Sequence, residues 1–264
     1  WLKEIVAGAD RQVVFIFAGK AHPADEPGKQ MTQRVYEVMS MHDFEGHVLF
    51  VEGYDLRLAR RLVAGVDVWL NNPIFPMEAS GTSGMKAGFN GVINLSVLDG
   101  WWGEGYDGAN GWAIKPANER LDDGRRNVEE SRSLYELLQD KVIPLYYERG
   151  TMGFSPEWIK MAKHSIMTLL PRFNSQRMVG EYLTRFYVPA SRRGKQMIER
   201  NYKTARDLAE WKRKVRAAWP HVTLRSVGKP EARVEFGHKV RFTVGAHIDR
   251  LVPEDIRVEL LISP

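Results

Sequence analysis

The chain has 264 residues, of which 44% are apolar, so it is long enough to bury the core of one large domain or two. It contains no cysteine, which excludes disulfide bonds and thiolate metal sites, and no apolar run long enough to span a membrane. The net charge is +5, and the basic excess lies in residues 190–216. Because acidic residues are interspersed there, we expect a solvated helix face rather than a nucleic-acid site.

The first part of the chain alternates strand-like and helix-like patterns. Continuous apolar runs predict buried strands at 12–17, 47–51, 66–70 and 91–97. Apolar residues at helical spacing predict helices at about 30–43, at about 56–63 and from about Ser83. Such alternation favours an α/β fold with a parallel sheet and helices on both faces. Ligands of these sheets bind at the carboxyl ends of the strands, from which we expect three loops to leave, at 18–29, 52–55 and 71–82.

Glycines, small hydroxyl residues, one carboxylate and one lysine are concentrated in residues 77–91, M-E-A-S-G-T-S-G-M-K-A-G-F-N-G. Glycine lets a backbone approach a bound group, and small hydroxyls add hydrogen-bond donors without bulk. A helix from about Ser83 would bring the Lys86 amine close to the loop's amides, at the positive end of the helix, which suits a phosphate-bearing cofactor. The spacing matches neither a Walker loop nor a dinucleotide fingerprint. A structural turn with a solvated lysine is therefore an equally good interpretation.

Residues 99–112, D-G-W-W-G-E-G-Y-D-G-A-N-G-W, combine glycines with three tryptophans and a tyrosine. Aromatic faces beside carboxylates are typical of sugar-binding surfaces, because sugar C–H groups pack on rings and hydroxyls need acceptors. An aromatic-anchored structural loop fits the same residues equally well. The sequence leaves both interpretations open.

From residue 128 the pattern is helical for some ninety residues. One helix should bend or end near Pro144, a second begins at Ser155-Pro156, a third is capped by Asn174 or Ser175, and a basic helix covers about 196–218. After Pro220, alternating apolar and polar residues predict half-buried antiparallel strands at 232–236, 239–244 and 256–262. We therefore expect two domains, 1–219 and an incomplete β-rich module at 220–264.

Residues 78–86, E-A-S-G-T-S-G-M-K, followed by N-G-V-I-N-L-S-V-L-D-G at 90–100, closely resemble the cofactor segment of the α-glucan phosphorylases. The likeness extends to A-G-K-A-H-P at 18–23 and V-L-F-V-E-G-Y-D at 48–55, favours the bacterial branch, and covers about residues 12–190. It implies the C-terminal, Rossmann-like domain of a two-domain glycosyltransferase fold of the GT-B type, followed by helices and a short β-rich tail.

The resemblance implies phosphorolysis of terminal α-1,4-glucosyl bonds of glycogen or maltodextrin, giving glucose 1-phosphate with retained configuration. It also implies the cofactor pyridoxal 5′-phosphate, bound as a Schiff base by Lys86. The cofactor phosphate then acts as a proton relay, which its second pKa near 6 permits. Thr82, Ser83 and Gly84 match the loop that binds this phosphate, and Tyr54 matches a tyrosine near the cofactor.

Glu78 matches the acid that accepts a hydrogen bond from a glucose hydroxyl, and Ser80 and Gly81 match the positions whose backbone donates to the same sugar. The expected catalytic residues are therefore Lys86, Glu78 and Tyr54. No metal is expected, since the histidines lack metal-ligand spacing.

Two positions depart from the muscle-type enzymes. Ser83-Gly84 stands where those members have Gly-Asn, and Asp55 stands where they have arginine. An acid thus replaces a cation near the cofactor.

The resemblance implies α-1,4-glucan and inorganic phosphate as substrates and the N-terminal phosphorylase domain as a partner, without nucleic acid or membrane, and leaves a homo-oligomer open. The N-terminus has neither a starting Met nor a signal-peptide layout, so we expect an excised piece of a cytoplasmic protein. The family's basic segment K-R-x-H-E-Y-K-R is missing from these residues. Two phosphate groups would repel without its cations, so the fragment alone should have little or no activity.

Two other functions stay open. One is a retaining glycosyltransferase of the glycogen synthase type, which uses a nucleotide-sugar donor and no pyridoxal. The other is a non-catalytic glucan-binding module.

Overall fold

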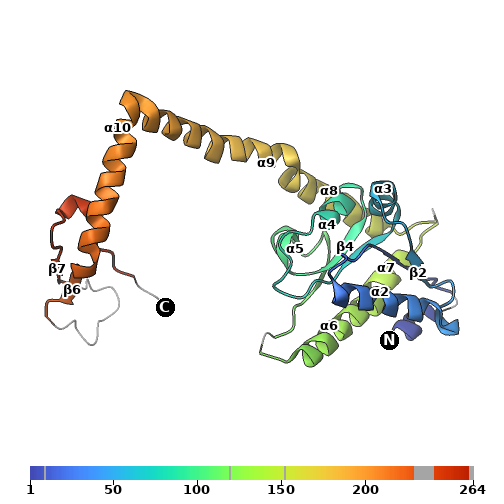
Figure 1. Ribbon diagram of the computed structural model, residues 1–264. Coiled ribbons are helices and arrows are strands. Elements are labelled where there is room, and N and C mark those ends of the chain that lie inside the picture. The colour runs from blue at the N-terminus through green and yellow to red at the C-terminus, as the bar shows by residue number, and fades with distance from the viewer. Residues whose placement is uncertain (9, 119, 152, 229–240, 262–264) are drawn as a thin grey trace. The chain divides into compact units, whose positions relative to one another are not determined.

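The computed structural model describes residues 1–8, 10–118, 120–151, 153–228 and 241–261, and the chain forms two compact units, Trp1–Met178 and Val179–Pro264. The first unit contains two parallel sheets (Figure 1). In one, β1 (Phe15–Ala18) pairs with β2 (Val48–Val51); in the other, the order is β3 (Val68–Asn71), β4 (Ile93–Val97), β5 (Gly111–Ile114). The predicted α/β fold with parallel strands is confirmed, but the described strands form two sheets instead of one.

The helices of the first unit alternate with the strands up to β5, and further helices then follow in succession. They are α1 (Leu2–Val6), α2 (Glu26–Met39), α3 (Leu56–Gly65), α4 (Thr82–Phe89), α5 (Gly100–Gly105), α6 (Asp123–Leu137), α7 (Ile143–Tyr147), α8 (Pro156–Phe173) and α9 (Ser175–Tyr182), which runs on into the second unit. Figure 1 shows α4 and α8 on one side of β4, and α6 and α7 on the other. Helices therefore cover both faces of the β3–β4–β5 sheet, as the pattern predicted.

Local sequence signals set several helix starts. The side chains of Asp25, Asp55 and Ser155 accept hydrogen bonds from the backbone amides three residues on, Gly28, Leu58 and Trp158. Such caps satisfy amide groups that have no partner within the helix. The predicted start at Ser155-Pro156 is confirmed.

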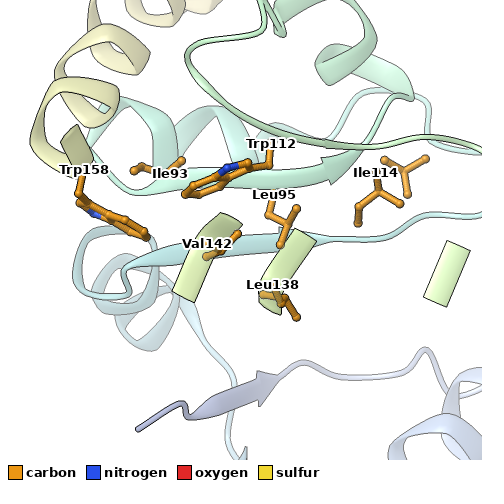
Figure 2. Packing of buried hydrophobic residues seen from close by; sticks show 8 residues of the cluster. Ile93, Leu95, Trp112, Ile114, Leu138, Val142 and Trp158 are labelled. Atoms are coloured by element: carbon orange, nitrogen blue, oxygen red, sulfur yellow. The ribbon is translucent and has the colours of Figure 1, made fainter. Parts of the chain in front are cut away.

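The core of the first unit is centred on β4, whose five residues are all buried. Ile93, Leu95 and Val97 belong to an apolar cluster with Leu138 and Val142, which Figure 2 shows together with Trp112 and Trp158. The alternate residues of β4 are polar, and one of them, Asn94, donates from Nδ2 to the carbonyl of Gly84 in α4. One face of β4 therefore packs on apolar side chains, and the other fixes the helix that contains Lys86.

Two prolines that were expected to interrupt or precede helices lie inside continuous helical segments. Pro144 and Pro189 each follow a π-helical turn, at Leu138–Val142 and Leu183–Tyr187. In each turn the amide just before the proline bonds to a carbonyl five residues back, from Ile143 to Leu138 and from Val188 to Leu183. The wider turn accommodates a residue that lacks an N–H and that clashes with a regular turn. The helical segment then ends at Tyr147, which agrees with the predicted bend or end near Pro144.

In the second unit, α10 (Val188–Ala218) contains four residues with non-helical backbone angles, Glu199 to Tyr202. The predicted basic helix thus begins earlier than residue 196 and is divided at 199–202. The pair of tail strands, β6 (Thr223–Ser226) and β7 (Val244–His247), is antiparallel. Of the strands predicted in the tail, 232–236 lies outside the described residues, 239–244 overlaps β7 only at Val244, and 256–261 forms no strand.

The C-terminal segment is fixed to α10 by the carboxylate of Asp255. Its oxygens accept hydrogen bonds from Trp211 Nε1 at 2.8 Å and from Lys214 Nζ at 2.7 Å. The Lys214 ammonium and the other donors lower the pKa of Asp255 to about 2. None of the helices in the described ranges is both long and apolar enough to cross a membrane.

Candidate functional site

The carboxyl end of β3 opens into a hollow of about 380 Å³. It is lined by Asn71, Glu78, Ala79, Ser80, Gly81, Thr82, Ser83 and Gly84. The predicted substrate residues and the predicted phosphate-loop residues therefore surround one hollow. Its place at the end of a parallel strand is where ligands of α/β folds bind.

Two glycines of this loop are required by the protein's own packing. Gly81 has φ +93°, which favours glycine, and a Cβ there would lie 2.7 Å from Cδ1 of Trp101. At Gly84 a Cβ would lie 2.7 Å from Oδ1 of Asn94 and 2.9 Å from Trp101. The loop thus packs on Trp101 and Asn94 through its glycines. The sequence had suggested that these glycines allow close approach of a ligand, and it missed their contact with the tryptophan.

Asp99 fixes the part of the loop that contains Glu78. Its Oδ2 accepts a hydrogen bond from the Glu78 amide at 2.9 Å, and its Oδ1 accepts one from the Gly100 amide at 2.8 Å. The Trp101 amide donates to the carbonyl of Ser80 at 2.8 Å. Asp99 is 9% exposed, so these bonds are shielded from water. The start of α5 therefore holds the substrate side of the hollow in one conformation.

The Glu78 carboxylate points back to its own loop, since Oε1 accepts a hydrogen bond from the Ser80 amide at a long 3.4 Å. A bond of this length is weak. A ligand with hydroxyl groups can therefore compete for both the carboxylate and the amide.

Lys86 lies one helical turn after Thr82 on α4 and is exposed. No ion pair of its ammonium occurs among the residues that the structure describes. The next two residues are buried: Ala87 is 0% exposed, and a Cβ on Gly88 would lie 2.8 Å from Cδ1 of Leu169 in α8. The buried face of α4 thus directs the lysine toward solvent on the helix face that it shares with Thr82.

Tyr54 is not brought to this hollow. It is half-buried in the loop that follows β2, and it is not among the residues that line the hollow. The neighbouring Asp55, which departs from the muscle-type pattern, accepts a hydrogen bond from the Leu58 amide at 2.8 Å and caps α3. That carboxylate has a structural function in this chain.

The tryptophans of residues 99–112 belong to the core. Trp101, Trp102 and Trp112 are 3%, 0% and 7% exposed. Trp102 donates from Nε1 to the carbonyl of Trp112 at 3.1 Å. Of the two interpretations of this loop, the aromatic-anchored structural one is confirmed for the tryptophans, and they form no sugar-binding surface.

Asp107 joins this loop to α8. It accepts hydrogen bonds from the amides of Ala109 and Asn110 at 2.9 and 3.0 Å, and its Oδ2 lies 2.8 Å from Nε2 of His164. Burial, the largest single influence, raises the pKa of the Asp107 carboxyl, but the bonds from Ala109, His164 and Asn110 together lower that pKa below its usual value.

Because the pKa of Asp107 is lowered in the folded protein, we expect this carboxylate to contribute stability that is lost in acid. The stabilising contribution of Asp107 is present above the unfolded pKa of about 4 and is lost as the pH falls through the lower folded pKa. We expect the thermal midpoint of the full-length protein to fall more steeply below about pH 4 than that of Asp107→Asn. An exposed matched control, Asp10→Asn, should follow the unsubstituted protein; parallel pH profiles for all three proteins would contradict the prediction.

Comparisons with known proteins match the stretch of chain that forms the hollow. The family model described as carbohydrate phosphorylase matches residues 3–103, which include the hollow and Lys86. A maltodextrin phosphorylase of Thermococcus litoralis is 45% identical over 259 residues, which is 98% of this chain and 30% of the relative. The chain thus contains a carbohydrate phosphorylase domain.

Two further relatives of this chain are also phosphorylases. A glycogen phosphorylase of Aquifex aeolicus is 50% identical over 186 residues, 70% of this chain and 26% of the relative. One of Mycobacterium tuberculosis is 38% identical over 261 residues, 98% of this chain and 30% of the relative. The chain thus spans about 30% of the length of the maltodextrin phosphorylase that it matches. Similarity also reaches beyond residues 12–190, the range on which the resemblance was based, into the tail.

The sequence missed the residues that support the hollow, chiefly Asp99, Gly100 and Trp101. A usable signal was present, since Asp99-Gly100 follows the buried strand β4 and so lies at the same sheet edge as the end of β3. Within the described ranges, no group of three or more potential ligand side chains could hold a metal ion.

Proposed function

We propose that this chain is the cofactor- and sugar-binding C-terminal part of an α-glucan phosphorylase. The intact enzyme cleaves terminal α-1,4-glucosyl bonds of glycogen or maltodextrin with inorganic phosphate and releases glucose 1-phosphate. One observation carries the proposal: residues Glu78 to Gly84 line a single hollow, and Lys86 follows one helical turn after Thr82. The names of the similar proteins, which are glycogen and maltodextrin phosphorylases, support it.

The residues of the hollow fit pyridoxal 5′-phosphate. When bound, this group supplies a phosphate that gives and takes protons near neutral pH. The first two amides of α4, at Thr82 and Ser83, lie at the positive end of an eight-residue helix and can donate to such a phosphate. The Gly84 amide donates to the carbonyl of Gly81 at 3.2 Å, so Gly84 would contribute by leaving room for the phosphate. The exposed Lys86 amine is the group that would hold the cofactor's aldehyde.

The substrate side of the hollow would bind a glucosyl unit. Glu78 would accept a hydrogen bond from a sugar hydroxyl, and the amides of Ser80 and Gly81 would donate to the same sugar. The long Ser80–Glu78 bond is the one that the sugar replaces. Tyr54 would lie near the cofactor once the complete domain is assembled.

The remaining parts of the proposal concern the whole protein. Its two parallel sheets would belong to a Rossmann-like domain of the GT-B type at 1–219, followed by a β-rich module at 220–264. An N-terminal phosphorylase domain would form the other wall of the cleft, and the enzyme would act in the cytoplasm. The residues that line the hollow include no lysine or arginine, so the cations that neutralise two phosphates must come from elsewhere.

Covalent trapping on Lys86 tests the proposal. Full-length protein supplied with pyridoxal 5′-phosphate and then reduced with borohydride should contain a pyridoxyl group on Lys86, found by peptide mass spectrometry. Lys86→Arg keeps the charge and should remain unlabelled. If the unsubstituted protein is unlabelled too, the proposal fails and the nucleotide-sugar transferase is favoured.

A second measurement concerns the isolated chain. We expect the 264 residues alone to release no glucose 1-phosphate from maltodextrin and phosphate, because the cations and the facing domain are missing. Turnover comparable to that of the full-length protein would contradict this expectation.

A further inference from the structure

The indole ring of Trp101 lies edge-on against the first turn of α4. Its Nε1 is 3.1 Å from the position of a Cβ on Gly81 and 3.0 Å from that of a Cβ on Gly84. The ring atom nearest to the first of these positions is Cδ1, and the one nearest to the second is Cζ2. Because Nε1 lies between these two carbons on the ring edge, its N–H points at the part of the loop between the two glycines.

The ring is fixed in this orientation by its other contacts. Trp101 is 3% exposed, and its ring centroid lies 5.1 Å from that of Trp102 and 5.3 Å from that of Phe173. Its backbone amide donates to the carbonyl of Ser80 at 2.8 Å. Trp101 therefore supports the loop twice, with its main chain at Ser80 and with its ring edge at Gly84. A side chain packed in this way keeps its N–H in one direction.

The indole N–H of Trp101 has no acceptor among the residues that the structure describes. Buried indole N–H groups usually have one, as Trp102 has in the carbonyl of Trp112. The fully shielded polar side-chain atoms without a partner in the described ranges are Asn94 Oδ1 and Ser165 Oγ, and Trp101 Nε1 is not one of them. The indole nitrogen is therefore partly open to solvent at the loop that lines the hollow.

This donor lies at the end of the hollow where α4 begins. Gly81 and Gly84 flank Thr82 and Ser83, whose amides are free to donate at the start of the helix. An indole nitrogen is a donor only, so its partner must be an acceptor such as an anion. Since no lysine or arginine lines the hollow, an anion there depends on neutral N–H donors.

We propose that the indole N–H of Trp101 is a further hydrogen-bond donor to the phosphate group of the bound cofactor, beside the amides of Thr82 and Ser83. This inference rests on the proposed function, which supplies pyridoxal 5′-phosphate as the ligand. A hydrogen bond from a neutral donor to an anion is stronger than one between neutral groups. The core already holds the ring, so little conformational freedom is lost when the bond forms.

An acceptor within the protein competes for the same donor. The shielded Oδ1 of Asn94 lies 2.7 Å from the Cβ position of Gly84, beside the Trp101 ring. A bond between Trp101 and Asn94 would stabilise α4 whether or not a phosphate is bound. The two assignments therefore differ in their dependence on the phosphate group.

The affinities of the full-length protein, freed of cofactor, for pyridoxal 5′-phosphate and for pyridoxal measure that dependence. Trp101→Phe keeps an aromatic ring and removes the N–H. We expect it to weaken binding of pyridoxal 5′-phosphate by about tenfold or more and to leave binding of pyridoxal, which lacks the phosphate, unchanged.

Trp158→Phe is the matched control. Trp158 is 8% exposed, its indole N–H also has no acceptor in the described part of the chain, and it packs in the apolar cluster of Figure 2 without lining the hollow. We expect this variant to bind both compounds as the unsubstituted protein does.

The outcomes separate this inference from the proposed function. An equal loss of affinity for both compounds in Trp101→Phe, or no loss for either, would overturn the inference and leave the proposed function standing. If the unsubstituted protein binds no pyridoxal 5′-phosphate, the proposed function fails and the inference fails with it.

A crystal structure of the unsubstituted full-length protein with pyridoxal 5′-phosphate tests the same bond without a substitution. We expect Trp101 Nε1 to lie within about 3.2 Å of a phosphate oxygen. Donation from Nε1 to Asn94 or to another protein acceptor in that structure would overturn the inference.

Discussion

Replacing Trp102 with alanine is expected to lower the free energy of unfolding of the first unit by about 3–5 kcal/mol, the usual cost of a large-to-small change in a core. The Trp102 side chain is 0% exposed, and its ring lies 5.1 Å from Trp101 and 5.4 Å from Tyr106. Its Nε1 donates to the carbonyl of Trp112. Alanine would leave a cavity and remove this hydrogen bond. Urea unfolding of the full-length protein measures the change.

Trp1→Ala is the matched control, because Trp1 belongs to the same unit but is 49% exposed. Its ring stacks on Tyr135 at 5.6 Å, a contact worth about 0.5–1.5 kcal/mol. The prediction for Trp102 is wrong if both substitutions cost the same.

Replacing Asp99 with alanine should change both stability and sugar affinity. The carboxylate accepts from two backbone amides, Glu78 and Gly100, and hydrogen bonds to charged groups contribute about 1.5–3 kcal/mol each. We expect a loss of stability of at least about 1.5 kcal/mol. Since Glu78 loses the bond that fixes its backbone, affinity of the full-length protein for maltodextrin should fall about tenfold or more, the equivalent of about 1.4 kcal/mol.

The control for Asp99 is Asp122→Ala, which removes a carboxylate that accepts from the Arg125 amide at the start of α6. The Asp122 side chain is 66% exposed, and the loss of such a cap costs about 1 kcal/mol. Calorimetric titration with maltodextrin should therefore find unchanged affinity for this variant. Equal losses of affinity for the two variants would show that Asp99 acts through stability alone.

The parts of the fold that could be predicted are those encoded locally. Ser155-Pro156 gives the start of α8, because a cap and a first-turn proline act within one helical turn. The hollow was predictable for the same reason, since Glu78 to Gly84 are contiguous in the chain. Lys86 follows in the same segment.

The parts that could not be predicted depend on contacts between distant residues. Asp99 reaches Glu78 across 21 positions only because β4 pairs with β3. The burial of Trp101 was likewise undecided, because an aromatic side chain suits both a core and a sugar-binding surface. The helix with Pro144 ends at Tyr147, near the proline as predicted, but the wide turn of five residues that precedes it was not predicted.

The close packing of Gly88 against Leu169 fixes the position of α4 relative to α8. Leu169 is 0% exposed and occupies the space that a larger residue at 88 would need, so α4 cannot slide or turn about its axis without displacing it. The position of the Lys86 amine then depends on how α4 packs against α8, and not on the side chains around the hollow. A change of shape at position 169, on the buried side of α4, is therefore a means of shifting that amine without altering any residue of the hollow.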